Sequence, residues 1–234
     1  MGKLKIRKNV KYQPRAAAGK VGNFGFLMSI PGLLILSGSS CALLIISLSQ
    51  TSSPVNQWFL LLGGLLASVV LSLTFAVERL RTLLHELKHG VVVVLSGNSV
   101  KGMTIGKGSG HIDYTLRYDK LHFAPVICLA PYFLPLLSAP ILAAAIFFEN
   151  QHLDLFLFLL GLGLGFDTST AFYDLHPNQS DLKRVFGGFA IASIFIASFH
   201  IFWISTCLTW ANAKSQGYLH AGKILYQTIV KLIQ

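Results

Sequence analysis

The residues of this chain with the clearest chemical potential are His85, Glu86 and His89, which form an HExxH motif. On a helix, two histidines four residues apart lie one turn apart on the same face, so both imidazoles can bind one Zn²⁺. The Glu86 carboxylate can then take a proton from a water molecule that the metal activates. With 8 His in the chain, random placement produces this pattern only about 0.003 times. The alternative is a set of polar groups at a helix end, which would be costly beside an apolar segment without a use.

The elements that position the motif are membrane helices, as the composition indicates. Hydrophobic residues make up 53% of the chain and charged residues 12%, and the mean hydropathy is +0.61. We predict an all-α polytopic membrane protein with about five transmembrane helices, each near the roughly 20 residues that cross the hydrocarbon. The second helix carries the HExxH motif at its end and can continue to Leu95. The predicted spans are residues 24–48, 58–84, 123–148, 153–173 and 185–210.

The net charge of +10 is explained by membrane topology rather than by nucleic acid binding. With the N-terminus inside, 16 of the 19 Lys and Arg residues fall in the inside segments 1–22, 78–121 and 174–184, and three fall in the tail after Ala213. Positive residues concentrate on the cytoplasmic side of membrane proteins. We therefore expect a cytoplasmic N-terminus, an extracytoplasmic C-terminus and a cytoplasmic HExxH motif.

Two segments outside the spans have patterns of their own. Residues 96–116 contain short runs of β-forming residues around a Gly-rich turn at Gly106–Gly110, which predicts a small cytoplasmic-side β-hairpin after the HExxH helix. The alternative is an ordinary loop. Residues 213–234 alternate apolar residues with lysines, and this pattern is typical of an amphipathic helix on a membrane surface.

A catalytic zinc needs a third protein ligand and an open position for water. The end of the fourth span and the loop after it offer Asp167, Asp174, Asp181 and His176. The spacing of seven between the aspartates would place them near one face of an unbroken helix, but Pro177 makes a break more consistent with the sequence. The alternative for each aspartate is a carboxylate paired with a nearby cation, of which the candidates are Arg79, Arg81, Lys183 and Arg184.

The order of these features resembles the site-2 protease family of intramembrane zinc metalloproteases, and the match is closest to a divergent branch. The resemblance covers about residues 60–185: an HExxH at a membrane-helix end, a hairpin, a helix, and a helix closing on a Pro-containing Asp motif. In that second motif Asp174 stands where the family has Asn, Pro177 matches, and Asp181 matches the metal-binding Asp. Besides Asp174, the chain departs from the family at Leu182 and Lys88, which each stand where the family commonly has Gly, and the spacing from Pro177 to Asp181 is one residue shorter.

The resemblance implies a zinc-dependent intramembrane endopeptidase. His85, His89 and Asp181 would hold one Zn²⁺ per chain, and Glu86 would be the catalytic base. Asp174 would orient the substrate or be an alternative ligand, and Asp167 would be a further alternative. The partners would be a transmembrane protein substrate and the lipid bilayer, without nucleic acid, in a multi-pass protein of a bacterial inner membrane.

The resemblance also suggests a division of the chain and leaves other functions open. Residues 1–22 would be a basic cytoplasmic segment, 23–212 a membrane-embedded metalloprotease-like domain with its core at about 58–185, and 213–234 an amphipathic tail. An inactive relative that binds or sequesters a membrane partner is the main alternative function. A metal transporter is a weaker one, because no span repeats His or Asp along its length.

Overall fold

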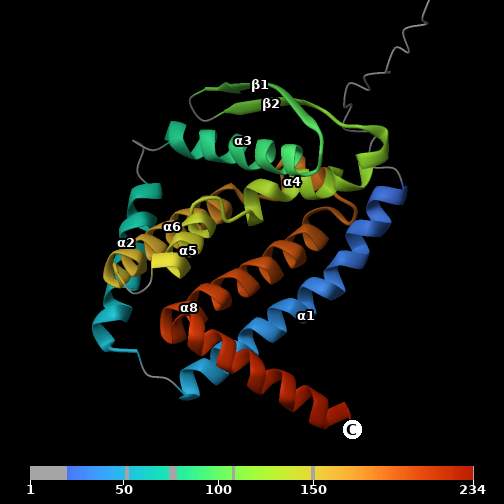
Figure 1. The fold of residues 1–234 in the computed structure, drawn as a ribbon. Helices are drawn as coiled ribbons and strands as arrows, with labels where there is room; N and C mark the ends of the chain where they lie inside the picture. Colours follow the sequence, from blue (N-terminus) through green and yellow to red (C-terminus); the bar gives the residue numbers. More distant parts are fainter. Residues whose placement is uncertain (1–19, 51–52, 74–77, 107–108, 149–150, 234) are drawn as a thin grey trace, which may run out of the picture.

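The computed structural model describes residues 20–50, 53–73, 78–106, 109–148 and 151–233, so the basic segment 1–22 lies almost entirely outside the described residues. In chain order the elements are α1 (Lys20–Gln50), α2 (Val55–Leu73), α3 (Glu78–Leu95), β1 (Ser99–Ile105), β2 (Gly110–Thr115), the 3₁₀ helix η2 (Tyr118–Phe123), α4 (Ala124–Phe133), α5 (Ser138–Phe148), α6 (Leu153–Asp174), α7 (Ser180–Arg184) and α8 (Gly188–Ile233). Figure 1 shows a bundle of long helices with the hairpin lying over α3 at one end.

The protein is a multi-pass membrane protein, as the composition predicts. Four helices are long and apolar enough to cross a bilayer, over Phe26–Gln50, Val55–Ser72, Leu153–Asp174 and Gly188–Lys231. The segments Tyr118–Phe133 and Ser138–Phe148 together pass the same criterion but are bent by 73°, which gives up to five spans. Large apolar side chains are exposed along these helices, as expected for surfaces that face lipid.

The prediction that the HExxH motif ends the second span is wrong. The apolar helix α2 ends at Leu73, and the motif lies on a separate helix, α3, which crosses the end of the bundle beneath the hairpin (Figure 1). The physical reason is the polar start of α3, where Glu78, Arg79 and Arg81 fall within one turn. Charged side chains are energetically unfavourable inside the hydrocarbon, so this helix is not part of the second span.

The predicted third span is not one straight helix but two, α4 and α5. The chain breaks between Phe133 and Ser138, where Leu134 is extended (φ −67°, ψ 120°) just before Pro135. Proline removes a backbone donor and disfavours helical geometry in the residue before it, which explains the break. The 73° bend carries α5 away from the line of α4.

The predicted β-hairpin is confirmed. Strands β1 and β2 are antiparallel, with Met103 paired to Ile112 and an irregularity between Val100 and Gly102. The hairpin packs on α3 at Gly90, where an added Cβ would lie 3.0 Å from the Cδ1 atom of Ile112. The absence of a side chain at Gly90 therefore lets the hairpin lie close to the helix that carries the motif.

Two apolar clusters hold the helices that matter for the site. One joins α1, α3, α4, α7 and α8, and Leu182 on α7 is completely buried in it. The other joins α2, α5, α6 and α8. Within the second cluster α2 and α6 approach closely, because a Cβ on Gly161 would overlap the carbonyl oxygen of Leu61. The first cluster thus fixes α7, and the second fixes α6.

The last element, α8, extends well beyond the predicted span of 185–210. Its helical run reaches Ile233 but is interrupted at Lys214, which adopts non-helical angles (φ 54°, ψ −170°). Figure 1 shows the tail turning at the end of the bundle opposite the hairpin. The tail is helical, as its pattern predicts, and its location on a membrane surface stays a prediction.

Candidate metal centre

Helix α3 presents the three motif residues at the end of the bundle. His85 and His89 lie one turn apart with ring centroids separated by 5.2 Å. Glu86 and His89 are buried, each with 7% relative exposure. The i, i+4 spacing therefore places both imidazoles on one side of the helix, as the motif predicts.

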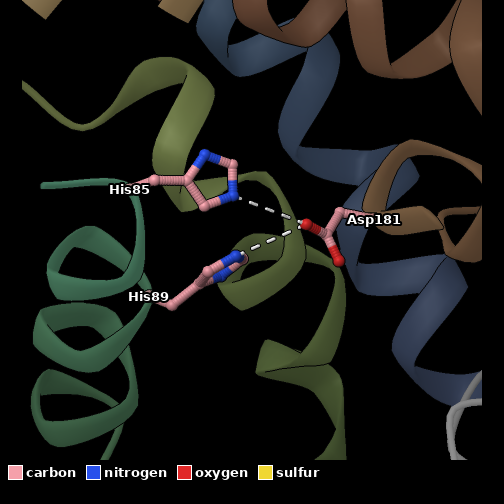
Figure 2. A group of neighbouring side chains, drawn as sticks. All are labelled: His85, His89 and Asp181. Carbon is pink, nitrogen blue, oxygen red and sulfur yellow. Dashed lines mark ion pairs between the residues drawn. The ribbon is translucent and has the colours of Figure 1, made fainter. Parts of the chain in front are cut away.

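Asp181 reaches the two histidines from the other side of the site (Figure 2). Its Oδ2 atom lies 3.4 Å from Nε2 of His89 and 3.8 Å from Nε2 of His85. Two ligands that each bind zinc at about 2.0–2.1 Å in tetrahedral geometry lie about 3.3 Å apart. One ligand atom from each of the three residues lies within 4.8 Å of the others, so this group could hold a metal ion.

The local backbone explains how Asp181 arrives there. Helix α6 ends at Asp174, the chain turns through Pro177, and the short helix α7 begins at Ser180. Leu182, the neighbour of Asp181, is completely buried in the core of α1, α3, α4 and α8. A leucine at this position therefore anchors α7 and holds Asp181 toward the histidines.

Each histidine is oriented through its other ring nitrogen. Nδ1 of His85 lies 2.8 Å from Oδ2 of Asp174, and Nδ1 of His89 donates a hydrogen bond of 2.7 Å to the carbonyl oxygen of Ile127. Such bonds fix the ring and leave Nε2 available for a metal, as is usual for histidine ligands. Both Nε2 atoms face Asp181.

Asp174 and Asp167, the two alternative ligands, lie outside this group of three. Asp174 contacts the far nitrogen of His85. Asp167 is buried and accepts hydrogen bonds from the backbone N–H groups of Leu137 and Ser138, at 3.0 Å and 2.9 Å. Its other oxygen lies 3.3 Å from Nζ of Lys88. Asp167 therefore caps the start of α5 and balances a buried lysine.

The remaining candidate ligand, His176, is exposed and accepts a hydrogen bond from the backbone N–H of Asn178. Residue type and spacing did not reveal the orienting partners, because Ile127 acts through its carbonyl oxygen and Asp174 through a contact across 89 residues. Arg184 is one of the cations near the aspartates in the sequence. It lies 3.5 Å from Oδ1 of Asp181, the oxygen that does not face His89.

Opposite charges meet at the centre. Burial alone would lower the pKa of His85, but hydrogen bonds and attraction from Asp174 and Asp181 outweigh it and raise the pKa from 6.5 to about 9. Burial alone would raise the pKa of Asp181, but the two imidazoles hold it well below its usual range. A metal ion must therefore displace a proton from His85, so metal affinity falls as pH falls.

Two pockets meet at this centre. One, of about 360 Å³, opens beside Arg81, His85 and Asp174, and the other, of about 400 Å³, opens beside His89 and strand β2. Glu86 and Asp181 line both. Solvent-sized molecules can thus reach the centre from two sides.

Gly110 at the start of β2 is required for this arrangement. A Cβ at Gly110 would lie 2.6 Å from Cγ of Glu86, so only glycine lets the strand come this close. The five consecutive residues from Gly110 to Tyr114 all line the second pocket. Successive side chains of a strand point to opposite faces, so the edge of β2 faces this pocket.

The chain brings together two imidazoles, a carboxylate and an adjacent buried glutamate beside accessible space. This donor set suits zinc, which prefers nitrogen and oxygen ligands in tetrahedral sites. Comparison with known proteins finds no match: no protein family, curated protein or solved structure is similar to this chain at a level that establishes a relationship.

Proposed function

We propose that this protein is a zinc-dependent intramembrane endopeptidase that cuts peptide bonds in or near a transmembrane helix of its substrate. The observation that carries the proposal is the convergence of His85, His89 and Asp181 with Glu86 beside them. Three protein ligands leave one position of a tetrahedral metal open, which is the arrangement of catalytic rather than structural zinc. When bound, the metal would activate water and polarise a carbonyl group.

Other residues of the chain would orient the imidazoles and transfer a proton. Asp174 and the Ile127 carbonyl keep the imidazoles oriented. Glu86 lines both pockets, so its carboxylate can take a proton from an attacking water molecule and pass it to the leaving amine. The carboxylate would thus act first as a base and then as an acid.

The substrate would have to be extended at the site. The carbonyl groups of a helix are bonded to N–H groups four residues on, so a helical segment must unwind before attack. The β2 edge that lines the second pocket could hold the unwound segment as an added strand. Among the described residues the sheet has only the strands β1 and β2, and β1 covers the other edge of β2.

The location of the site supports a membrane substrate. Asp174, which contacts His85, is the last residue of a candidate span, and α8, a second span, begins at Gly188 just after α7. The centre therefore lies close to the ends of two membrane helices. A substrate helix in the same bilayer could present its terminal turn there after unwinding.

The test compares wild-type protein with Glu86→Gln, which removes the carboxylate but preserves side-chain volume. New protein N-termini in the membranes of producing cells should appear with the wild type and disappear with Glu86→Gln, while zinc content stays the same. Asp154→Asn, at the first turn of α6 far along the chain from the site, is the control and should behave as wild type. Zinc binding without any cleavage would instead favour a binding protein, and undiminished cleavage by Glu86→Gln would exclude this mechanism.

A further inference from the structure

One buried polar group near the metal centre has no partner. Tyr132, the ninth residue of α4, is completely buried, and its hydroxyl makes no hydrogen bond within the part of the chain that the structure describes. Burying an unpaired hydroxyl is unfavourable, and such groups in folded proteins call for an explanation. Tyr132 is also a residue that neither the motif nor the spacing of the aspartates indicates.

The ring of Tyr132 lies against the metal centre. It meets the ring of His85 edge to face, with centroids 5.8 Å apart and an interplanar angle of 85°. Cys128, one turn earlier on α4, lines the second pocket together with Glu86 and His89. Tyr132 lies one turn after Cys128, and its ring contacts His85, which lines the first pocket.

The same stretch of α4 is tied to the HExxH helix at two other points. The Ile127 carbonyl accepts a hydrogen bond from His89, and the Pro131 carbonyl lies 3.5 Å from Nζ of Lys88. On the far side, the backbone carbonyl of Tyr132 accepts a hydrogen bond of 2.8 Å from Nε2 of His200. The tyrosine is therefore held in position before any ligand binds.

We propose that the Tyr132 hydroxyl donates a hydrogen bond to the ligand oxygen that carries negative charge at the His85–His89–Asp181 centre. In the proposed peptidase, on which this inference rests, that oxygen belongs to the carbonyl group under attack. A tyrosine hydroxyl is a good neutral donor, and donors fixed in advance around a developing oxyanion are among the strongest contributors to catalysis. The missing partner of Tyr132 is thus supplied by the ligand.

The first test is the stability of Tyr132→Phe, measured on purified protein without ligand. Because the hydroxyl has no partner to lose, the thermal midpoint should equal or exceed that of the wild type, and zinc content should be unchanged. A hydroxyl with a structural role would give the opposite result. A lower midpoint for Tyr132→Phe would therefore overturn the proposal.

The second test uses acetohydroxamate, a small anionic chelator, on Co²⁺-loaded protein, and follows the visible spectrum. Tyr132→Phe should bind it at least tenfold more weakly than the wild type, since bonds to charged groups are stronger than neutral ones. Tyr226→Phe, on the exposed tail of α8, is the matched control and should bind as the wild type does. If Tyr132→Phe binds acetohydroxamate as tightly as the wild type, only the role of the Tyr132 hydroxyl is overturned. If the wild type binds neither cobalt nor zinc, the proposed function is overturned as well.

Discussion

Among the single residues of the candidate centre, those that could bind a metal differ from those that orient the ligands. His85, His89 and Asp181 converge through the three atoms that could bind a metal, whereas Asp174 lies on the other nitrogen of His85. Supporting carboxylates of this kind typically change metal affinity 10–100-fold when they are replaced. Ligands and supports should therefore differ in the size of their effects.

We expect purified protein to contain about one zinc per chain. His85→Ala, His89→Ala and Asp181→Ala should each remove most of it, because two remaining ligands hold the metal poorly. Asp174→Asn should instead retain zinc at saturating metal and show roughly 10–100-fold weaker affinity in competition with a chelator. If Asp174→Asn lost zinc as completely as Asp181→Ala, Asp174 would be a ligand and the assignment would be wrong.

A second residue-scale prediction concerns the metal-free protein. The pKa of His85 is raised from 6.5 to about 9 in the folded state, so its contribution to stability is fully present below pH 6.5 and is lost as pH rises through 9. The free energy of unfolding should fall across this window by at most about 3 kcal/mol. Thermal midpoints of chelator-treated protein, measured across this pH range, test the prediction. The midpoint of His85→Ala should change less with pH than that of the wild type. A wild-type midpoint that rises from pH 6.5 to 9 would contradict the charge arrangement.

Residue types and spacing were enough to predict part of this centre. Neighbours on one helix turn follow from sequence alone, so the motif predicts the pairing of His85 with His89. Asp181 followed from a resemblance around Pro177 rather than from any periodicity. The Ile127 carbonyl and the Tyr132 ring contact the centre from a helix about 40 residues away, and no local pattern records such contacts.

At the scale of elements, a buried ion pair links the HExxH helix to the broken helix pair. Lys88 and Asp167 have side chains only 3% and 6% exposed, and Asp167 also accepts bonds from the first N–H groups of α5. A lysine within the motif is therefore directed to the α4–α5 break rather than to the metal. The pair positions three helices relative to one another.

Asp167→Ala should destabilise the fold by about 3–5 kcal/mol, because it leaves the Lys88 ammonium buried and unpaired. The folded fraction should still bind zinc. The double variant Lys88→Met with Asp167→Asn removes the charge pair but keeps an acceptor for α5, so it should be more stable than Asp167→Ala. Thermal unfolding in detergent and zinc content together measure this, and a stable Asp167→Ala protein without zinc would identify Asp167 as a ligand instead.

Sequence patterns predict some of the secondary-structure elements and their boundaries better than others. Alternating β-forming residues around Gly106 predict the hairpin because both strands and the turn are local. Proline at positions 131 and 135 signals a break, but neither the 73° angle of the bend nor the bond from Leu137 to Asp167 on α6 can be predicted from local sequence. The polar start of α3 indicates a boundary after α2, yet hydropathy averaged over the segment hides it.

At the scale of the whole molecule, the centre constrains how the chain crosses the bilayer. Asp181 follows the C-terminal end of α6 and contacts histidines on α3, so this end of α6 lies on the same side as α3. The N-terminal end of the spanning helix α6 must then lie on the opposite side. The chain between α3 and α6 therefore has to cross once, and the bent pair α4–α5 is the only segment among the described residues between them that is apolar enough to do so.

The crossing by α4–α5 and the concentration of Lys and Arg in segments 1–22, 78–121 and 174–184 predict which loops share a side of the membrane. In a variant with Cys41, Cys128 and Cys207 replaced by alanine, Gln151→Cys after α5 should react with a membrane-impermeant maleimide added to intact spheroplasts. Lys101→Cys on β1 should react only after the membrane is permeabilised, and a reporter fused after Gln234 should be extracytoplasmic. These sites should differ because a five-span path with a cytoplasmic N-terminus would place the metal centre and hairpin inside and the α5–α6 connection and tail outside. Equal labelling of Gln151→Cys and Lys101→Cys would mean that α4–α5 re-enters on its own side, and the contact of Asp181 with His85 and His89 could then not form.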